Sequence, residues 1–318
     1  MLFLLFFAPY VPFCGHSGLK VGTLVFLGLI FGYISPSIQA SATTDVLAIA
    51  RSLIAAQRLP EARPPLEQLL AAEPANTEAR HLLARCYLGL QRYDDAIATL
   101  APPLSPPPPP PPADALAAPI LADYSEACLH RAAELGTSFR ALSLARRGRD
   151  ALEKASTLDP GNILYHEGLV EFYRHAPMIA GGSRAKALAH AQAATRLDPL
   201  RGGLLEASIH ADEKRFTEAL ALCAAALAAA PDNYLALYTL GRIAADSGLR
   251  PVDGTAALLR CLTLKPTPAE PPHSAVYFRL GLIAEKQNHR DEARAHFATS
   301  LRLSPAYRPA QDAVRRVQ

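Results

Sequence analysis

Residues 274–305 read SAVYFRLGLIAEKQNHRDEARAHFATSLRLSP, and this stretch shows the pattern that organises most of the chain. Its last residue, Pro305, follows the small Ala293 by twelve residues and the apolar Phe297 by eight. Five other prolines follow a small and an apolar residue at the same two distances: Pro74 after Ala62 and Leu66, Pro160 after Gly148 and Leu152, Pro199 after Ala187 and Ala191, Pro231 after Ala219 and Cys223, and Pro266 after Gly254 and Leu258. The recurrence indicates an internal repeat.

The distances between these prolines give the length of the repeat. From Pro160 onward, successive prolines lie 39, 32, 35 and 39 residues apart, which fits a unit of about 34 residues with loops of varying length. Small residues allow two helices to cross closely, larger apolar residues fill the space beside the crossing, and a proline cannot continue the second helix. The pattern therefore predicts an all-α array of helix-turn-helix units.

A family resemblance rests on the best copy of the repeat. The residues that show the resemblance are Tyr277, Leu280, Gly281 and Ala284 on the expected first helix, Ala293 and Phe297 on the expected second helix, and Pro305 at the end of the repeat. These residue types at these offsets resemble the tetratricopeptide repeat, a helix-turn-helix unit of about 34 residues. The resemblance implies an all-α fold, a right-handed α-solenoid of about seven such repeats, whose first helices form a concave wall that binds a protein or peptide segment.

The repeats divide the chain into five expected segments. These are a signal peptide or uncleaved anchor at 1–42, repeats one and two at 43–100, a proline-rich linker at 101–113, repeats three to seven at 114–305, and a C-terminal capping helix at 306–318. The third repeat is expected over 130–160, with an irregular middle. The final repeat would expose its apolar face if no helix covered it. The last segment is polar on one side, as expected for a helix that covers this face and presents its other side to solvent.

The N-terminal residues predict export. Residues 21–34 form an apolar run, and the small residues Ala40 and Ala42 then fit a signal-peptidase site with cleavage after Ala42. Fourteen helical residues span about 21 Å at ~1.5 Å each, which is short of the ~30 Å hydrocarbon core of a bilayer. We therefore expect a bacterial protein that is periplasmic or secreted, with a helix retained in the inner membrane as the alternative.

Composition and motifs argue against several classes of function. The 32 basic and 29 acidic residues are nearly balanced, without a basic run, so capture of nucleic acid is not expected. His166-Glu167 lacks the second histidine of a zinc-protease helix, and the sequence has no nucleophile turn, phosphate-binding loop or Cys-x-x-Cys. We expect no catalytic, cofactor-binding or metal-binding residues, and hence a protein that is not an enzyme. His81, His130 and His190 are interpreted as polar surface or groove residues.

Four cysteines follow the leader. Cys223 and Cys261 occupy helix-packing positions, where cysteine acts as a small apolar residue. Since export would place the chain in an oxidising compartment, a disulfide between Cys86 and Cys128 is an open alternative to free thiols.

Two interruptions of the repeat have two interpretations each. Residues 101–112 hold nine prolines, seven of them consecutive, which favour a stiff polyproline II spacer; this spacer is either a loop between repeats or a docking site for a proline-binding partner. The second interruption lies between the helices of the fourth repeat and contains Pro177, Gly181, Gly182 and Ser183. It either fixes an unusual angle between the helices or binds a ligand through glycine amides. Residues 124–199 around this loop are similar to a group of exported bacterial repeat proteins with an aromatic, Ala-Pro, Gly-Gly, Lys-Ala loop.

The family resemblance also places residues on the inner wall. The positions that the tetratricopeptide repeat directs toward a bound segment correspond here to His81, Arg85, Glu171, Arg174, Tyr238, Arg242 and Phe278. The lysine and asparagine pairing of chaperone-binding relatives is absent from the first repeats, so a chaperone tail is not the expected ligand. Arginines and aromatic residues suit an extended peptide of acidic character.

These observations together predict a non-enzymatic scaffold that binds protein or peptide in the bacterial envelope, with no cofactor and no nucleic acid. Two alternatives remain: an accessory ligand-binding or secretion component that uses the Gly181-Gly182 loop, and a membrane-tethered envelope adaptor that keeps its N-terminal helix.

Overall fold

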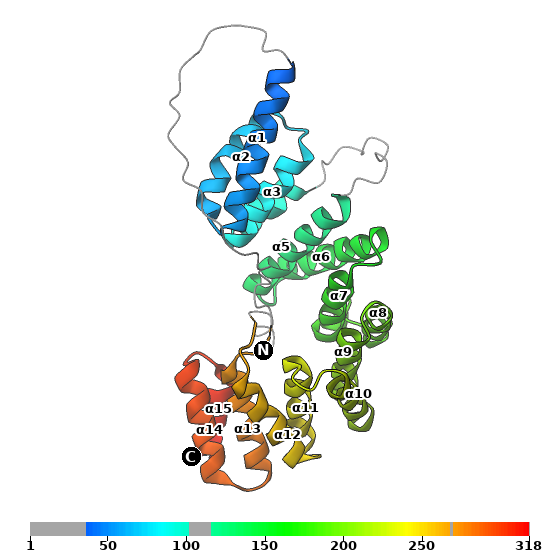
Figure 1. Ribbon diagram of the computed structural model, residues 1–318, viewed down its shortest axis with the longest axis vertical. Coiled ribbons are helices and arrows are strands. Elements are labelled where there is room, and N and C mark those ends of the chain that lie inside the picture. The colour runs from blue at the N-terminus through cyan, green and yellow to red at the C-terminus, as the bar shows by residue number, and fades with distance from the viewer. Residues whose placement is uncertain (1–35, 102–115, 268–269, 318) are drawn as a thin grey trace. The chain divides into compact units, whose positions relative to one another are not determined.

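A computed structural model of the chain describes residues 36–101, 116–267 and 270–317. Within these ranges the chain forms fifteen α-helices and one short 3-10 helix, and it contains no strand (Figure 1). The apolar run of the predicted leader and most of the predicted linker at 101–113 lie outside the described residues. The chain divides into two compact parts, which meet in sequence at Pro160 and Gly161.

The N-terminal part holds three helix pairs, one for each of the first three repeats. They are α1 (Pro36–Ala55) with α2 (Leu59–Ala72), α3 (Thr77–Gly89) with α4 (Tyr93–Leu100), and α5 (Ala117–Leu135) with α6 (Phe139–Leu158). Each helix packs on the next, and α1, α3 and α5, the first helices, also contact one another in sequence order. A single hydrophobic core runs through these pairs.

The C-terminal part holds four further pairs and a last helix. They are α7 (Ile163–His175) with α8 (Arg184–Leu197), α9 (Pro199–Asp212) with α10 (Phe216–Ala229), α11 (Tyr234–Ser247) with α12 (Pro251–Thr263), α13 (His273–Lys286) with α14 (Arg290–Leu303), and finally α15 (Arg308–Val317). Seven pairs of helices with this stacking confirm the predicted fold class, an all-α array of about seven helix-turn-helix repeats.

The proline-anchored pattern marks the packed interior. All six small residues and all six apolar residues at the two recurring distances are buried. Gly254 on α12 shows why two of the small positions are glycine: a Cβ there would stand 2.2 Å from the Cβ of Ala244 on α11. The close helix crossing expected from the sequence is therefore present.

Three of the same prolines are followed two residues later by an asparagine that starts the next repeat. The side-chain oxygen of Asn76 accepts a hydrogen bond from the amide of Ala79 (2.9 Å), and Asn233 caps α11 in the same way through Ala236 (2.9 Å). Asn162 caps α7 through the amide of Leu164 (3.1 Å). Each cap satisfies an amide that the first turn of a helix leaves without a partner.

Four of the seven turns inside a repeat are built alike. Each has one residue in the left-handed region, and the next amide donates to the carbonyl five residues before it. The left-handed residues are Gln57 (φ 58°), Gln91 (φ 58°), Lys214 (φ 60°) and Asn288 (φ 64°). None of the four is the glycine that this conformation favours.

The third repeat differs from its expected position. It was expected over 130–160, but its first helix, α5, begins at Ala117, and both helices of the pair, at 19 and 20 residues, are longer than every other helix except α1. Gly136 (φ 63°) ends α5 and forms the turn. A register derived from a fixed repeat length cannot accommodate helices that are one to two turns longer.

The last helix, α15, covers the end of the array. Ala310 and Ala313 are fully buried against a cluster that includes Phe278 and Phe297. On its outer side, Arg316 donates through Nε and Nη2 to the two carboxylate oxygens of Glu285, both at 2.7 Å. The helix thus has the apolar inner face and polar outer face of a cap.

Candidate functional site

The wall formed by the first helices carries a chain of ion pairs in the C-terminal part. Arg174 on α7 donates through Nε (2.9 Å) and Nη2 (2.7 Å) to Oδ2 of Asp212, at the end of α9. Arg242 on α11 approaches the other carboxylate oxygen of Asp212, with Nη1 at 3.3 Å. One carboxylate therefore joins three consecutive first helices.

The two arginines of this chain are held largely out of solvent. The side chain of Arg174 is 8% exposed and that of Arg242 is 16% exposed. Arg174 also donates through Nη1 to Oε1 of Glu171 (2.8 Å), whereas Nη2 of Arg242 is buried without a hydrogen-bond partner. Because a buried guanidinium needs acceptors, Asp212 is essential to this part of the wall.

A second ion pair continues along α11 and α13. Arg279 donates through Nη1 to Oδ1 of Asp246 (2.7 Å), and its guanidinium lies 5.6 Å from the centre of the Phe278 ring. Burial opposes the charge of Arg279, but Tyr238 and Asp246 hold its pKa above its ordinary value. Tyr238, Arg242 and Asp246 are spaced four residues apart, so they share one face of α11.

The aromatic candidates pack into the protein interior. Phe278 and Tyr238 are 9% and 8% exposed. The ring of Phe278 lies 5.8 Å from that of Phe297 and 5.5 Å from that of Tyr307, in the cluster that holds the last helix in place. These two side chains shape the wall and leave little surface for a ligand.

The N-terminal part brings together a separate pair. His81 on α3 is buried, with Nε2 2.8 Å from Oδ2 of Asp123 on α5. Arg85, one turn further along α3, is exposed. Of the seven predicted wall residues, Arg85 is therefore the one with the most open side chain.

Three of the residues that complete these contacts, Asp212, Asp246 and Asp123, were not predicted from the sequence. Asp212 lies 38 residues from Arg174 and 30 from Arg242, so no fixed spacing connects them. The four-residue spacing of Tyr238, Arg242 and Asp246 was the one sequence feature that could have indicated Asp246 as a wall residue.

The loop of the fourth repeat has a defined backbone. After α7, residues Met178–Ala180 form a 3-10 turn, and Gly181 (φ 101°) takes the left-handed conformation. Three successive amides donate to backbone carbonyls: Gly181 to Met178 (2.9 Å), Gly182 to Pro177 (3.1 Å) and Ser183 to Tyr173 (3.0 Å). Since the glycine amides already have acceptors, the geometry favours the interpretation that the loop fixes the path between α7 and α8.

The expected roles of Gly182 and Ser183 can be read from their contacts. A Cβ on Gly182 would stand 1.8 Å from the carbonyl oxygen of Ala176, so the loop can close only on glycine. The hydroxyl of Ser183 accepts from the amide of Lys186 at 3.4 Å, at the start of α8. Both residues therefore serve the local fold.

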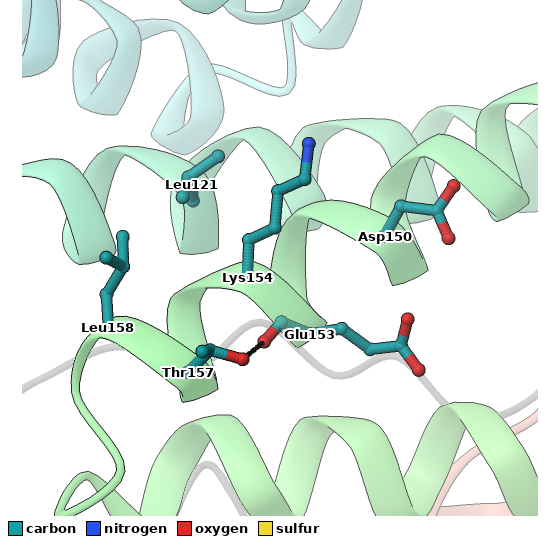
Figure 2. A pocket seen from close by; sticks show the side chains of 6 residues that line it. All are labelled: Leu121, Asp150, Glu153, Lys154, Thr157 and Leu158. Atoms are coloured by element: carbon teal, nitrogen blue, oxygen red, sulfur yellow. Dashed lines mark hydrogen bonds between the residues drawn. The ribbon is translucent and has the colours of Figure 1, made fainter. Parts of the chain in front are cut away.

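A hollow lies beside α6. It has a volume of about 540 Å³ and is lined by Leu121 of α5 and by five residues of α6: Asp150, Glu153, Lys154, Thr157 and Leu158 (Figure 2). The Thr157 hydroxyl donates to the backbone carbonyl of Glu153 (2.9 Å), as in many helices. The lining offers no nucleophile next to a base, so this hollow has no catalytic arrangement.

Three histidines and the four cysteines of the described chain occupy structural positions. His130 stacks on Tyr93 with ring centres 5.1 Å apart, and Nδ1 of His166 lies 3.1 Å from Nδ1 of His190. The four described cysteines are free and buried, so the alternative disulfide between Cys86 and Cys128 is not formed. No group of three or more side chains suited to a metal ion occurs in the described ranges. Likewise, none of the helices within them combines the length and apolar character needed to cross a membrane.

These features define a class of protein: a helical-repeat protein whose first helices are joined by a chain of ion pairs in its C-terminal part. Residues 53–120 and 274–307 match family models described as tetratricopeptide repeat. The chain thus contains tetratricopeptide repeats near both ends of its described array. None of the curated proteins compared with the chain matches its sequence.

Solved structures share the fold at low sequence identity. A tetratricopeptide repeat protein from Parabacteroides merdae is 12% identical, with a TM-score of 0.63 over 87% of this chain and 99% of the other. The C-terminal part of a repeat protein from Cytophaga hutchinsonii is 14% identical, with a TM-score of 0.52 over 84% and 99%. Yeast Tom70 is also 14% identical, with a TM-score of 0.52, and here 91% of this chain matches 58% of the other. At these sequence identities, the similarity to the three structures is a similarity of fold.

Proposed function

We propose that the chain is a non-enzymatic scaffold that binds an extended segment of a partner protein along its first helices. A protein-interaction role follows from the tetratricopeptide fold in general. The observation that supports this particular surface is the Asp212 bridge, which holds Arg174 and Arg242 in fixed positions on three neighbouring first helices. Groups whose rotamers are set in advance lose less entropy when a partner binds.

The charge of the wall suggests what kind of segment it binds. Arg242 contributes only one hydrogen bond to Asp212, at 3.3 Å, and Arg85 on α3 is exposed. A carboxylate of an acidic peptide would pair with the exposed Arg85. An extended, acidic peptide is therefore the proposed ligand class.

We place this scaffold in the bacterial envelope, on the strength of the predicted leader. The length of α1 supports cleavage after Ala42: α1 has 20 residues, and removal of Pro36 to Ala42 would leave 13, the length of α3 and α7. A membrane-tethered adaptor is the alternative if the leader is retained. Cell fractionation with N-terminal sequencing of the purified chain distinguishes the two.

A pull-down from envelope extract tests the binding surface. The full chain carrying Arg85→Ala and Arg242→Ala is compared with a matched control carrying Arg140→Ala and Arg260→Ala, which removes one arginine from a second helix in each part. We expect the first variant to lose partners that the wild type and the control retain. If it retained every partner at wild-type yield, the proposed wall would not be the binding site.

A loop-based accessory function, the other alternative, is tested in the same extract with Ile179→Ser. Loss of partners in this variant, but not in the arginine variant, would favour the loop over the wall.

A further inference from the structure

The loop between α7 and α8 presents two large apolar side chains to solvent. Met178 is 89% exposed and Ile179 is 66% exposed, and they are the only sequence neighbours among the exposed large apolar residues of the described chain. Ala180, the next residue, is buried. The turn therefore directs its small residue inward and its large ones outward, so packing of the repeat does not explain Met178 and Ile179.

The backbone under these side chains is fixed before any partner arrives. Gly181 adopts a left-handed conformation, and the amides of Ala180 and Gly182 both donate to the carbonyl of Pro177, at 2.8 and 3.1 Å. Pro177 itself is restrained by its ring. An apolar tip whose backbone is already fixed loses little conformational entropy when it is buried.

The charged residues of the sequence segment around the tip have one sign. From residue 172 to residue 197 the chain contains no aspartate and no glutamate, but it contains Arg174, Arg184, Lys186 and Arg196. Arg184 and Lys186 lie in the first turn of α8, directly after the loop, and both are exposed. The Lys186 ammonium also donates to the Tyr173 hydroxyl (3.1 Å), so Arg184 is the main cation beside the tip. Arg174 is already paired with Asp212 and Glu171, and the nearby His175 lies 3.1 Å from the carboxylate of Glu171.

An apolar tip flanked by exposed cations fits the surface of an anionic lipid bilayer. Apolar side chains of this kind enter the boundary between headgroups and acyl chains, while lysine and arginine remain among the phosphates. We propose that Met178 and Ile179 dock the C-terminal part of this chain on an anionic membrane surface, assisted by Arg184 and Lys186. This inference is separate from the peptide-binding wall, since it uses other residues.

Met178 provides a local readout, because the sequence contains only one other methionine, Met1. An exposed methionine is readily converted to its sulfoxide, and burial in lipid slows this reaction. The full chain is treated with hydrogen peroxide in buffer, with phosphatidylcholine vesicles, and with vesicles of phosphatidylcholine and phosphatidylglycerol. Oxidation of the peptide that holds Met178 is followed by mass spectrometry, so the readout comes from the loop itself.

We expect Met178 to be oxidised several-fold more slowly with the anionic vesicles than with neutral vesicles or buffer. Arg184→Glu should require about tenfold more anionic lipid for the same protection, whereas Arg196→Glu, at the far end of α8, should not. Ile179→Ser should also weaken protection, and Val252→Ser, which alters another exposed apolar residue (75% exposed), should leave it unchanged.

Three results would overturn the proposal. The first is an unchanged rate of Met178 oxidation with anionic vesicles. The second is equal protection by neutral and anionic vesicles. The third is protection that appears without lipid as protein concentration rises, which would identify a contact between copies of the chain. Unchanged thermal unfolding of each variant shows that a loss of protection is not a loss of fold.

Discussion

Gly281 on α13 lies against the ring of Phe297 on α14, so closely that a Cβ on the glycine would stand 2.4 Å from Cε1 of the phenylalanine. The ring is fully buried and also packs beside Phe278. Gly241 and Leu258 repeat this relationship in the preceding pair, where the same contact would be 2.3 Å. The first helix thus supplies an empty space that the second helix fills.

Removing either partner of this contact should destabilise the chain. Phe297→Ala should lower the free energy of unfolding by about 3–5 kcal/mol because it leaves a cavity. Gly281→Ala should lower it by about 1–3 kcal/mol because the added methyl group overpacks the crossing. Urea denaturation followed by circular dichroism measures both, with Leu303→Ala, at a half-exposed site of α14, as the control. A loss below about 1 kcal/mol for Phe297→Ala would contradict the assigned packing.

The left-handed turn residues predict a stabilising substitution. Gln91 has φ 58°, a conformation that costs a residue with a Cβ about 1 kcal/mol. Gln91→Gly should therefore raise the free energy of unfolding by up to about that amount. Gln287, another exposed glutamine, follows the end of α13 with φ −85°, so Gln287→Gly should give no gain. Equal effects of the two substitutions on the urea midpoint would argue against strain at Gln91.

The bridging carboxylate should matter more than an exposed one of the same type. Asp212→Ala leaves Arg174 without its main partner and should cost about 1–3 kcal/mol. Asp232→Ala breaks the pair with Arg260 in which both side chains are at least half exposed, and should cost less than about 1 kcal/mol. The same denaturation measurement compares the two. A smaller loss for Asp212→Ala would show that Arg174 finds another acceptor.

The last helix should loosen in acid. The two hydrogen bonds from Arg316 hold the pKa of Glu285 below its ordinary value of about 4.3. Since the folded state binds this proton less tightly than the unfolded state, the contribution is complete above the ordinary pKa and is lost as pH falls through the lowered one. Hydrogen-exchange protection of residues 308–317 should fall over that range. Glu285→Gln should remove much of this dependence, whereas Glu292→Gln, at an exposed site, should not.

The four described cysteines should resist alkylation while the chain is folded. Burial raises the pKa of the Cys86 thiol to about 11, and those of Cys223 and Cys261 to about 12. Few thiolates are therefore present near pH 8, and the sulfur atoms are inaccessible. Mass spectrometry after iodoacetamide treatment should find these peptides labelled only in denaturant. Rapid labelling of Cys223 in the native protein would mean that its helix pair opens.

The fold could be predicted from the sequence because its rule is local and repeats. A small residue, an apolar residue four positions later and a proline eight positions after that fit within one helix and its end, as Ala293, Phe297 and Pro305 do. The length of α5 could not be predicted in this way, because a fixed period assigns every repeat the same helices.

The contacts between repeats were less accessible to sequence reasoning. Arg174 and Arg242 were predicted for the wall, but Asp212, which contacts both, was not. Phe278 was predicted for the same wall, yet it packs under the last helix, because its position in the final repeat adjoins the cap. Neither relation has a characteristic spacing, since loops of different length separate the helices.

The Asp212 bridge also has a practical consequence for dividing the chain. A fragment that ends between α7 and α9, or between α9 and α11, would separate a carboxylate from a guanidinium and leave a largely buried charge uncompensated. Truncations that yield stable, soluble pieces should therefore keep α7 to α11 intact, and their ends belong before Ile163 or after Ser247.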